Sequence, residues 1–339
     1  GEHEPQQAVL MAWPCRPDNW RERAAPAQKA FCEVAAAISA ATPVTMLAGA
    51  NEMDNARRQL PAGVNLECID ANDSWMRDIG PSYVVNGAGG LRGVDWCFNA
   101  WGGQVNGLYE DWSADDAMAA RVVELRGESA YRAPLVLEGG SIHVDGQGTC
   151  FTTAECLLHP GRNPQYQQAE IEGLLGDSLG VEKVIWLPRG LYNDETDGHV
   201  DNILHVVRPG VVVLTWCDDP ADPVYAICRE CERALLADRD ARGRALEVHR
   251  LPLPGPLFLS EAEAAGIVPS AGMERSAGER LAGSYANFLI TNDRVVFPLL
   301  DQATDNEAAH ILGVSLFDPD SDRFAVTASK TAEIESLLL

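Results

Sequence analysis

Residues 201–216, DNILHVVRPGVVVLTW, best indicate how this chain folds. An aliphatic run leads into the turn-forming residues 208–210 and resumes beyond them, a pattern typical of two antiparallel strands joined by a tight turn. The same pattern occurs in residues 81–96, 140–153 and 284–299, each time around a polar or glycine-containing turn. The sequence therefore predicts four β-hairpins.

Helix-like stretches rich in Ala, Leu and Glu separate these hairpins. They are residues 27–41, 113–125, 165–179 and 225–236. Hairpins that alternate with helices indicate an α/β fold, and hairpins that recur at roughly 60, 60 and 80 residues indicate a repeated supersecondary unit that closes on itself. Because no Pro/Ser-rich linker or charged block divides the sequence, we expect a single domain over residues 1–339.

The charge balance of the chain favours a small cationic ligand. Lys and Arg number 26 against 50 Asp and Glu, which gives a net charge of −24. Such a negative field repels nucleic acids and anionic membranes and attracts cationic solutes. We therefore expect a small cationic partner, no nucleic acid and no membrane, and the sequence leaves a homo-oligomer open.

Hydropathy and cysteine spacing indicate a cytoplasmic protein. No stretch reaches the roughly 18 consecutive apolar residues of a membrane helix, and the first residues do not resemble a secretory signal. The nine cysteines are scattered through the sequence, unlike those of a disulfide scaffold, so we expect reduced core residues. The CxxC pair Cys228 and Cys231 has no second pair, and we interpret it as structural.

Three polar clusters stand directly beside apolar runs: NDSWMRD in residues 72–78, LEGGSIH in residues 137–143 and TDGHVD in residues 196–201. Carboxylates, a histidine and tryptophans that converge at strand ends suit a flat cation. Two carboxylates can hold a guanidinium through paired charge-assisted hydrogen bonds. The sequence therefore predicts a guanidine ligand.

The first cluster joins an aromatic ring to a carboxylate. The face of Trp75 attracts a cation, and Asp78 can accept its N–H donors. The alternative for Asp78 is a turn aspartate paired with Arg77. Trp101 could form another wall of the pocket, and a tryptophan of the core is the alternative there.

The other clusters supply acid and base groups. His199 and Asp201 stand at strand spacing, which predicts that both face one side, where the imidazole can shuttle protons and the carboxylate can hold a cation. A structural ion pair is the alternative. Glu138 precedes two glycines that let backbone approach a ligand, or simply form a turn. A metallohydrolase that also uses His205 is disfavoured, because no further ligand spacing supports it.

Together with residues 11–14, 98–103 and 284–288, these clusters resemble the agmatine deiminase family, which is related to the bacterial peptidylarginine deiminases and belongs to the guanidino-group-modifying pentein superfamily. The resemblance implies a pentein fold, a five-bladed pseudo-symmetric α/β propeller, which agrees with the recurring hairpins. It also implies that agmatine and water give N-carbamoylputrescine and ammonia through a covalent thiouronium, without a metal or other cofactor. Free arginine and peptidyl-arginine are alternative substrates, and the acidic balance favours agmatine.

The resemblance also implies roles for individual residues. Asp78 and Asp201 would bind the guanidinium, and His199 would act as general acid and base. Glu138 would support the substrate or the histidine, and Trp75 would contact the substrate.

One part of the family pattern is missing from this sequence. Members of the family close with a Gly-rich segment that ends in Ile-His-Cys, whose cysteine attacks the guanidinium carbon, whereas no cysteine follows Cys231 here. Residues 138–143 resemble that segment, but Val144 stands where the nucleophile would be. We expect that the nucleophile segment follows Leu339 in a longer protein. The alternative is a relative that binds guanidines without cleaving them.

Overall fold

The computed structural model describes residues 1–269, 275–315 and 325–329. Within those residues the strands form five three-stranded sheets, and helices connect them, so the predicted α/β fold is confirmed. The strands are β1 (Val9–Ala12), β2 (Val44–Ala48), β3 (Asn65–Cys68), β4 (Ser82–Val85), β5 (Leu91–Cys97), β6 (Ala130–Val136), β7 (Ile142–Val144), β8 (Thr149–Thr153), β9 (Lys183–Leu187), β10 (Leu204–Arg208), β11 (Val211–Trp216), β12 (Glu247–Pro252), β13 (Leu289–Ile290), β14 (Arg294–Pro298) and β15 (Ala325–Ser329).

The helices range from single turns to four turns. They are η1 (Arg21–Ala24), α1 (Ala25–Ser39), α2 (Met53–Gln59), α3 (Met76–Ile79), α4 (Gly103–Asn106), α5 (Ser113–Asp116), α6 (Met118–Leu125), η2 (Gly139–Ser141), α7 (Ala154–Leu157), α8 (Gln168–Leu179), η3 (Val200–Asn202), α9 (Val224–Ala237), α10 (Glu261–Ala265), α11 (Asp305–His310) and η4 (Ile311–Ser315). Within the described ranges, none of them combines the length and the apolar character that crossing a bilayer requires.

Four of the five sheets repeat one pattern, and they confirm the four predicted hairpins. The first two strands of each sheet pair antiparallel: β4 with β5, β7 with β8, β10 with β11, and β13 with β14. The third strand, β6, β9, β12 or β15, then pairs parallel with the middle strand. A parallel neighbour requires a crossover connection, and α6, α8, α9 and α11 lie in these connections.

The fifth sheet departs from this pattern. Its strands β1, β2 and β3 are all parallel, with Val9 opposite Val44 and Thr45 opposite Asn65. β1 lies at the edge of the sheet. In the described part of the chain, this sheet therefore has no counterpart of the antiparallel first strand that opens the other four.

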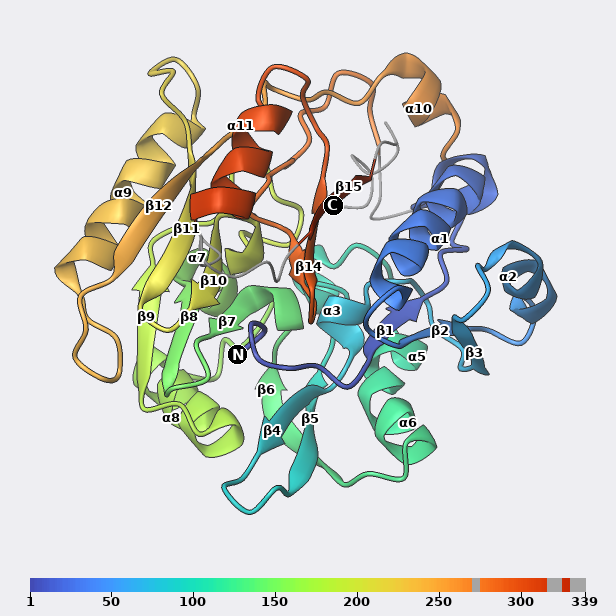
Figure 1. Cartoon of the computed structure of the whole chain (residues 1–339), viewed down its shortest axis with the longest axis horizontal. Helices are drawn as coiled ribbons and strands as arrows, with labels where there is room; N and C mark the ends of the chain where they lie inside the picture. The colour runs from blue at the N-terminus through green and yellow to red at the C-terminus, as the bar shows by residue number, and fades with distance from the viewer. Residues whose placement is uncertain (270–274, 316–324, 330–339) are drawn as a thin grey trace.

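The long helices bury one face each against the sheets. In α9, the buried residues Val224, Ile227, Cys228, Cys231 and Leu235 recur at helical spacing and form a single apolar stripe. That stripe packs in one core cluster with residues of β9, β10 and β11. Each fully buried aliphatic side chain contributes about 1.5–3 kcal/mol. Figure 1 shows α1, α6, α8 and α9 at the outside of the molecule and the short α3 near its middle.

The predicted helix over residues 113–125 is wrong as a single element. It divides at Ala117 into α5 and α6. Asp115 and Asp116 cause the interruption, because their carboxylates accept backbone N–H groups from other segments, those of Asn72 and Phe98. Short polar side chains of this kind compete with helical hydrogen bonding.

Three hairpin strands also begin later than predicted. Residues 200–202 form η3, and β10 starts at Leu204, while residues 139–141 form η2 before β7, and β13 starts at Leu289. In η2 and η3 the chain closes tight backbone turns, in which Ser141 donates to Glu138 and Ile203 donates to Val200. The strand geometry predicted for His199 and Asp201 is therefore wrong.

Candidate functional site

Three of the short turns carry the site. η2 contacts both α3 and η3, and each of the three turns lies just ahead of the first strand of a hairpin sheet: β4, β7 or β10. Asp78 lies within α3, Glu138 immediately precedes η2, and His199 and Asp201 flank the start of η3. The repeated position of these turns thus brings together side chains that are up to 123 residues apart (201 − 78).

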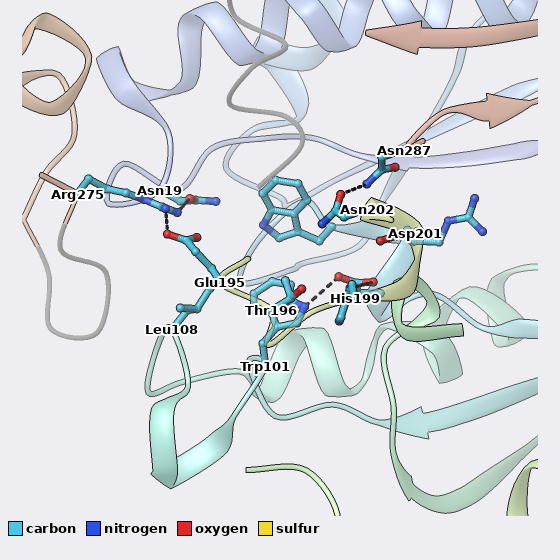
Figure 2. A pocket seen from close by; sticks show the side chains of 13 residues that line it. Asn19, Trp101, Leu108, Glu195, Thr196, His199, Asp201, Asn202, Arg275 and Asn287 are labelled. Carbon is cyan, nitrogen blue, oxygen red and sulfur yellow. Dashed lines mark hydrogen bonds and ion pairs between the residues drawn. The ribbon is translucent and has the colours of Figure 1, made fainter. Parts of the chain in front are cut away.

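Two carboxylates and the imidazole face a common point. A β-carbon built on Gly140 would lie 2.6 Å from Oδ2 of Asp201, 2.7 Å from Nδ1 of His199 and 2.8 Å from Oδ1 of Asp78. Real β-carbons do not come so close to other atoms, so only a glycine leaves this space free. Asp78, His199 and Asp201 also line a pocket of about 120 Å³. Figure 2 shows His199 and Asp201 at this pocket. Three of the four predicted catalytic residues therefore line one small pocket.

Asp78 is held in place by neutral donors. Its Oδ1 accepts the backbone N–H of Gly140 at 2.8 Å, and its Oδ2 accepts the indole N–H of Trp101 at 2.9 Å. Trp101 is 2% exposed and has a φ of +60°, an uncommon backbone conformation for a non-glycine residue. Both alternatives predicted for Trp101 hold, because it packs in the core and also lines the pocket.

His199 presents one nitrogen to the pocket and the other to Glu138. Its Nδ1 lies 3.9 Å from Oδ1 of Asp78, and its Nε2 lies 3.5 Å from Oε2 of Glu138. Burial alone would lower the pKa of His199, but the charge of Asp78 and polar contacts with Cys156 and Glu138 outweigh burial and hold the pKa well above its usual value. The imidazolium form is therefore favoured, and it can donate a proton toward the pocket.

Burial raises the pKa values of the two carboxylates that face His199, those of Asp78 and Asp201. For Asp201 the pKa rises to about 7, although the charge of His199 lowers it, and the charge of Asp78 raises it further. For Asp78 burial again raises the pKa, and His199 opposes it. Arg77 forms its ion pair with Glu2, so the alternative of a turn pair between Arg77 and Asp78 is wrong. Two carboxylates that resist ionisation are stabilised when a cation binds between them.

Glu138 lies behind the histidine, and the pocket walls do not include it. It is fully buried, and its Oε1 accepts Nε of Arg162 at 2.8 Å. Burial raises the pKa of Glu138, but the charge of Arg162 outweighs burial, and the net pKa is lowered. Arg162 also donates to the Thr196 carbonyl and to Asp197, each at 2.8 Å. The geometry places an ionised carboxylate against His199.

Arg162 was absent from the sequence predictions. It stands in residues 161–164, GRNP, which adjoin none of the three polar clusters. A single arginine in a turn gives no signal of burial, because the pairing with Glu138 across 24 residues is decided by the fold.

Trp75 forms a wall of the pocket. Its ring stacks on Trp20 with centroids 5.2 Å apart, and it meets Trp101 edge to face at 6.4 Å. Its indole N–H donates to Asp73 at 2.9 Å. An aromatic face at this position can cover a bound cation.

The far end of the pocket carries a second polar group that sequence reasoning missed. Figure 2 shows Glu195, Arg275 and Asn19 together at one end, with His199 and Asp201 toward the other. Glu195 forms an ion pair with Arg275, and burial raises its pKa although Arg275 lowers it. Glu195 stands only four residues before His199, so its nearness to the third polar cluster was an available signal.

The residues of this region that could ligate a metal ion are not the set His199, Asp201 and His205 considered from sequence. Donor atoms of Glu138, Cys156 and His199 lie within 4.8 Å of one another and could together ligate a soft metal ion. His205 is not near them. It lies in β10, with its ring 3.8 Å from that of Phe288 and its Nε2 3.4 Å from Glu2. The alternative of a metallohydrolase built on His199, Asp201 and His205 is therefore wrong.

Comparison with known proteins gives matches along nearly the whole chain. The family model described as Porphyromonas-type peptidyl-arginine deiminase matches residues 1–330. A protein of Photobacterium profundum with the name "Putative agmatine deiminase" is 58% identical over 311 residues, which cover 92% of this chain and 86% of the relative. A protein of the same name from Vibrio parahaemolyticus is 56% identical over 311 residues, with the same shares covered.

Solved structures agree with these matches. The agmatine deiminase of Enterococcus faecalis has a TM-score of 0.94 and 43% identity, over 99% of this chain and 91% of that chain. The "Putative Arginine Deiminase" of Porphyromonas gingivalis has a TM-score of 0.82 and 28% identity, over 99% of this chain and 93% of that chain. The α/β architecture is thus shared along the chain as a whole.

Proposed function

This chain belongs to the Porphyromonas-type peptidyl-arginine deiminase family, and from that membership we propose that it is an agmatine deiminase, which hydrolyses agmatine to N-carbamoylputrescine and ammonia. One observation carries the proposal: Asp78, His199 and Asp201 line one small pocket, and all three side chains pack closely against Gly140, where a larger residue would not fit. A planar guanidinium there would meet an acceptor on each side and a proton donor beside them.

The geometry supports the following proposed roles for these residues. Asp78 and Asp201 accept N–H groups of the guanidinium and keep the substrate cationic, so that its central carbon stays electrophilic. Trp75 and Trp101 line the pocket and cover the bound cation. Glu138 stabilises the charged form of His199 from behind.

Protons move through His199 in both halves of the reaction. A thiolate adds to the guanidinium carbon, and His199 gives a proton to the departing nitrogen, so that ammonia leaves and a covalent thiouronium remains. The imidazole then takes a proton from water as the water adds to the same carbon. The carbon–sulfur bond breaks, and the ureido product and the thiolate are released.

We propose that the nucleophile is a cysteine in a segment that follows Leu339, as the resemblance implies. The cysteines of the described residues do not line the pocket. Cys156 contacts His199, but it is fully buried, and burial raises its pKa, which disfavours the reactive thiolate.

An open place for such a segment supports this proposal. The edge strand β1 borders a second cavity of about 660 Å³, whose walls include Val9 and Phe297 and also Trp75, Arg77 and Asn287 of the substrate pocket. A strand paired antiparallel with β1 would give the fifth sheet the order of the other four, with β1 in the middle and β2 parallel to it, and β3 would be an additional strand. The added strand would reach the pocket through the residues that the two cavities share.

We propose on the same grounds that the five sheets form a five-bladed pseudo-symmetric propeller within a single domain over residues 1–339. Four sheets share one strand order, and the fifth would share it over three strands once the strand just described is added, with β3 as a fourth. Turns at equivalent positions supply the site, as expected when repeated units surround a common pocket. A cytoplasmic location and a homo-oligomer stay predictions from sequence.

Agmatine is the substrate that the far end of the pocket favours. Its ammonium would lie near Glu195, a carboxylate that lines the pocket opposite Asp201 (Figure 2). Free arginine would bring a carboxylate to the same place. The cation there, Arg275, already donates to Glu195 and Asn19. Peptidyl-arginine would need an open groove to admit the flanking chain.

Ammonia release from agmatine, free arginine and an arginine peptide, measured side by side with full-length protein, tests the proposal. We expect agmatine to have the highest kcat/KM. A haloacetamidine, which mimics the guanidinium, should label one cysteine beyond Leu339, and peptide mapping locates it. Preferred turnover of the peptide would contradict the choice of substrate, and labelling of Cys156 would contradict the choice of nucleophile.

A further inference from the structure

A buried carboxylate outside the pocket gathers an unusual number of hydrogen-bond donors. Asp73 is 3% exposed. Its Oδ1 accepts the indole N–H of Trp20 and the backbone N–H of Ser74, each at 2.8 Å. Its Oδ2 accepts Nδ2 of Asn19 at 2.7 Å and the indole N–H of Trp75 at 2.9 Å. Three side chains from two separate segments therefore converge on one residue that does not itself line the pocket.

The first connection leads to the aromatic wall. Trp75 lines the pocket, and Trp20 stacks behind it with ring planes 26° apart. Both indole N–H groups point to the same carboxylate, so Asp73 fixes the two rings relative to each other. A ring held in this way presents a set face to a bound cation, because rotation about its side-chain bonds would break the hydrogen bond.

The second connection leads to the far end of the pocket. Asn19 donates to Asp73 and accepts Nη2 of Arg275 at 3.0 Å, and Arg275 forms the ion pair with Glu195. Figure 2 shows Asn19, Arg275 and Glu195 side by side at this end. The orientation of Glu195 thus depends on Asp73 through two intermediate side chains.

We propose that Asp73 is a positioning residue that holds both the aromatic wall and the far carboxylate of the pocket, and thereby determines selectivity for guanidines with a distal ammonium. The inference rests on the proposed function of the pocket. Asp73 acts through Trp75 and Asn19 and does not touch the substrate.

The donor set explains why a carboxylate is needed here. Four N–H groups donate to Asp73, the Ser74 hydroxyl lies 3.5 Å from its Oδ1, and an ionised carboxylate offers acceptor sites to all these donors. An asparagine at this position would turn an NH₂ group against N–H donors on one side and leave them unsatisfied. Asp115 fixes the backbone nearby, because its Oδ1 accepts the N–H groups of Asn72 and Asp73.

The test is the variant Asp73→Asn, compared with wild type on agmatine and on n-butylguanidine, which lacks the distal ammonium. We expect KM for agmatine to rise about tenfold with kcat nearly unchanged, because the variant disturbs binding rather than proton transfer. The preference for agmatine over n-butylguanidine should fall by about the same factor. Asp73→Glu, which keeps the charge, should restore part of the preference.

Asp95→Asn is the matched control. Asp95 is also a buried carboxylate, and it pairs with Arg132 away from the pocket. The Asp95→Asn variant should be less stable than wild type, but its preference between the two guanidines should be unchanged. If Asp73→Asn likewise changes only stability, Asp73 is a structural residue and the proposal is overturned.

Two further variants separate the connections even if Asp73→Asn does not fold. Asn19→Ala should raise KM for agmatine more than KM for n-butylguanidine and so reduce the preference, whereas Trp75→Phe, which keeps a ring without the N–H, should raise KM for both by a similar factor. Unchanged preference in Asn19→Ala would overturn the proposal.

Calorimetric titration of wild type with agmatine distinguishes failure of the proposed function from failure of the role of Asp73. If agmatine neither binds nor reacts, the proposed function fails and the inference fails with it, whereas binding with unaltered selectivity in the variants sinks the role of Asp73 alone.

Discussion

The two ends of the pocket hold their carboxylates in different ways. At the inner end, neutral donors hold Asp78, and the pKa of Asp201 rises to about 7. At the far end, Glu195 already has the fixed cation Arg275 as its partner. The two inner carboxylates thus share the charge of one imidazolium, His199, whereas Glu195 forms an ion pair with an arginine. This contrast indicates that the inner end binds the reacting group and that the far end adjusts selectivity.

The largest effect is expected at the inner end, from His199→Ala. Loss of the proton shuttle should lower kcat by a factor of about 10²–10⁴, with affinity for agmatine changed much less, because the imidazole acts mainly on transition states. Turnover and binding affinity are measured separately for this purpose. Weak binding with normal kcat at saturation would make His199 a binding residue. The inner end would then no longer differ from the far end by a role in proton transfer.

The next largest effect is expected from Asp78→Asn and Asp201→Asn. Each variant removes one charge from a buried arrangement with the bound cation, which should weaken substrate binding by about 3–5 kcal/mol. Titration with agmatine measures this loss. Near-normal affinity in both variants would contradict the guanidinium clamp.

The same carboxylates predict opposite effects of pH on stability and on binding. The folded pKa of Asp201, about 7, lies above the ordinary 3.8, so the folded protein binds more protons than the unfolded chain between these values. The contribution of Asp201 to the free energy of unfolding is therefore present below about pH 4 and is lost as the pH rises to 7. Affinity for agmatine should increase over the same range, because the cation binds the ionised form.

The variant Asp201→Asn tests whether the ionised Asp201 lowers the stability of the folded protein while it strengthens agmatine binding. The variant should unfold at a higher temperature than wild type at pH 8, with a gain of up to about 4 kcal/mol in the free energy of unfolding, since a raised pKa costs about 1.4 kcal/mol per unit. Thermal unfolding at pH 5 and pH 8 measures it. A lower melting temperature at pH 8 would mean that Asp201 has a stabilising partner in the free protein, and the contrast between the two ends would disappear.

A smaller effect is expected from Gly140→Ala, which tests the close packing of the site residues against Gly140. The added methyl group would lie within 2.8 Å of Asp78, His199 and Asp201, so kcat/KM for agmatine should fall about 10–100-fold as these side chains move apart. The matched control is Gly173→Ala in α8, where nothing lies within 4 Å. It should keep full activity and gain about 1 kcal/mol of stability.

The smallest effect is expected at the far end, from Glu195→Gln. Because this carboxylate is already paired and 20% exposed, its loss should cost agmatine about 1–2 kcal/mol in kcat/KM and leave n-butylguanidine unaffected. Kinetics on the two substrates measure the difference. Equal losses on both would show that Glu195 supports the pocket generally and does not recognise the ammonium.

The repeating architecture and the inner end of the site could be predicted from the amino-acid sequence. Hairpin patterns are local, since an apolar run, a turn and a second run specify antiparallel pairing within about fifteen residues. For the same reason the polar clusters around Asp78, Glu138 and His199 were visible, because each stands beside its own hairpin.

The way in which those groups act together is decided by the tertiary structure and could not be predicted from the sequence. The turns η2 and η3 replace predicted strand, because buried polar side chains there favour tight backbone turns. Arg162 behind Glu138, the far carboxylate Glu195 and the donor set of Asp73 all depend on contacts between distant segments. Local pattern cannot report such contacts, since burial and partner choice are set when the sheets pack. The pKa values that make the inner end receptive to a cation follow from that burial.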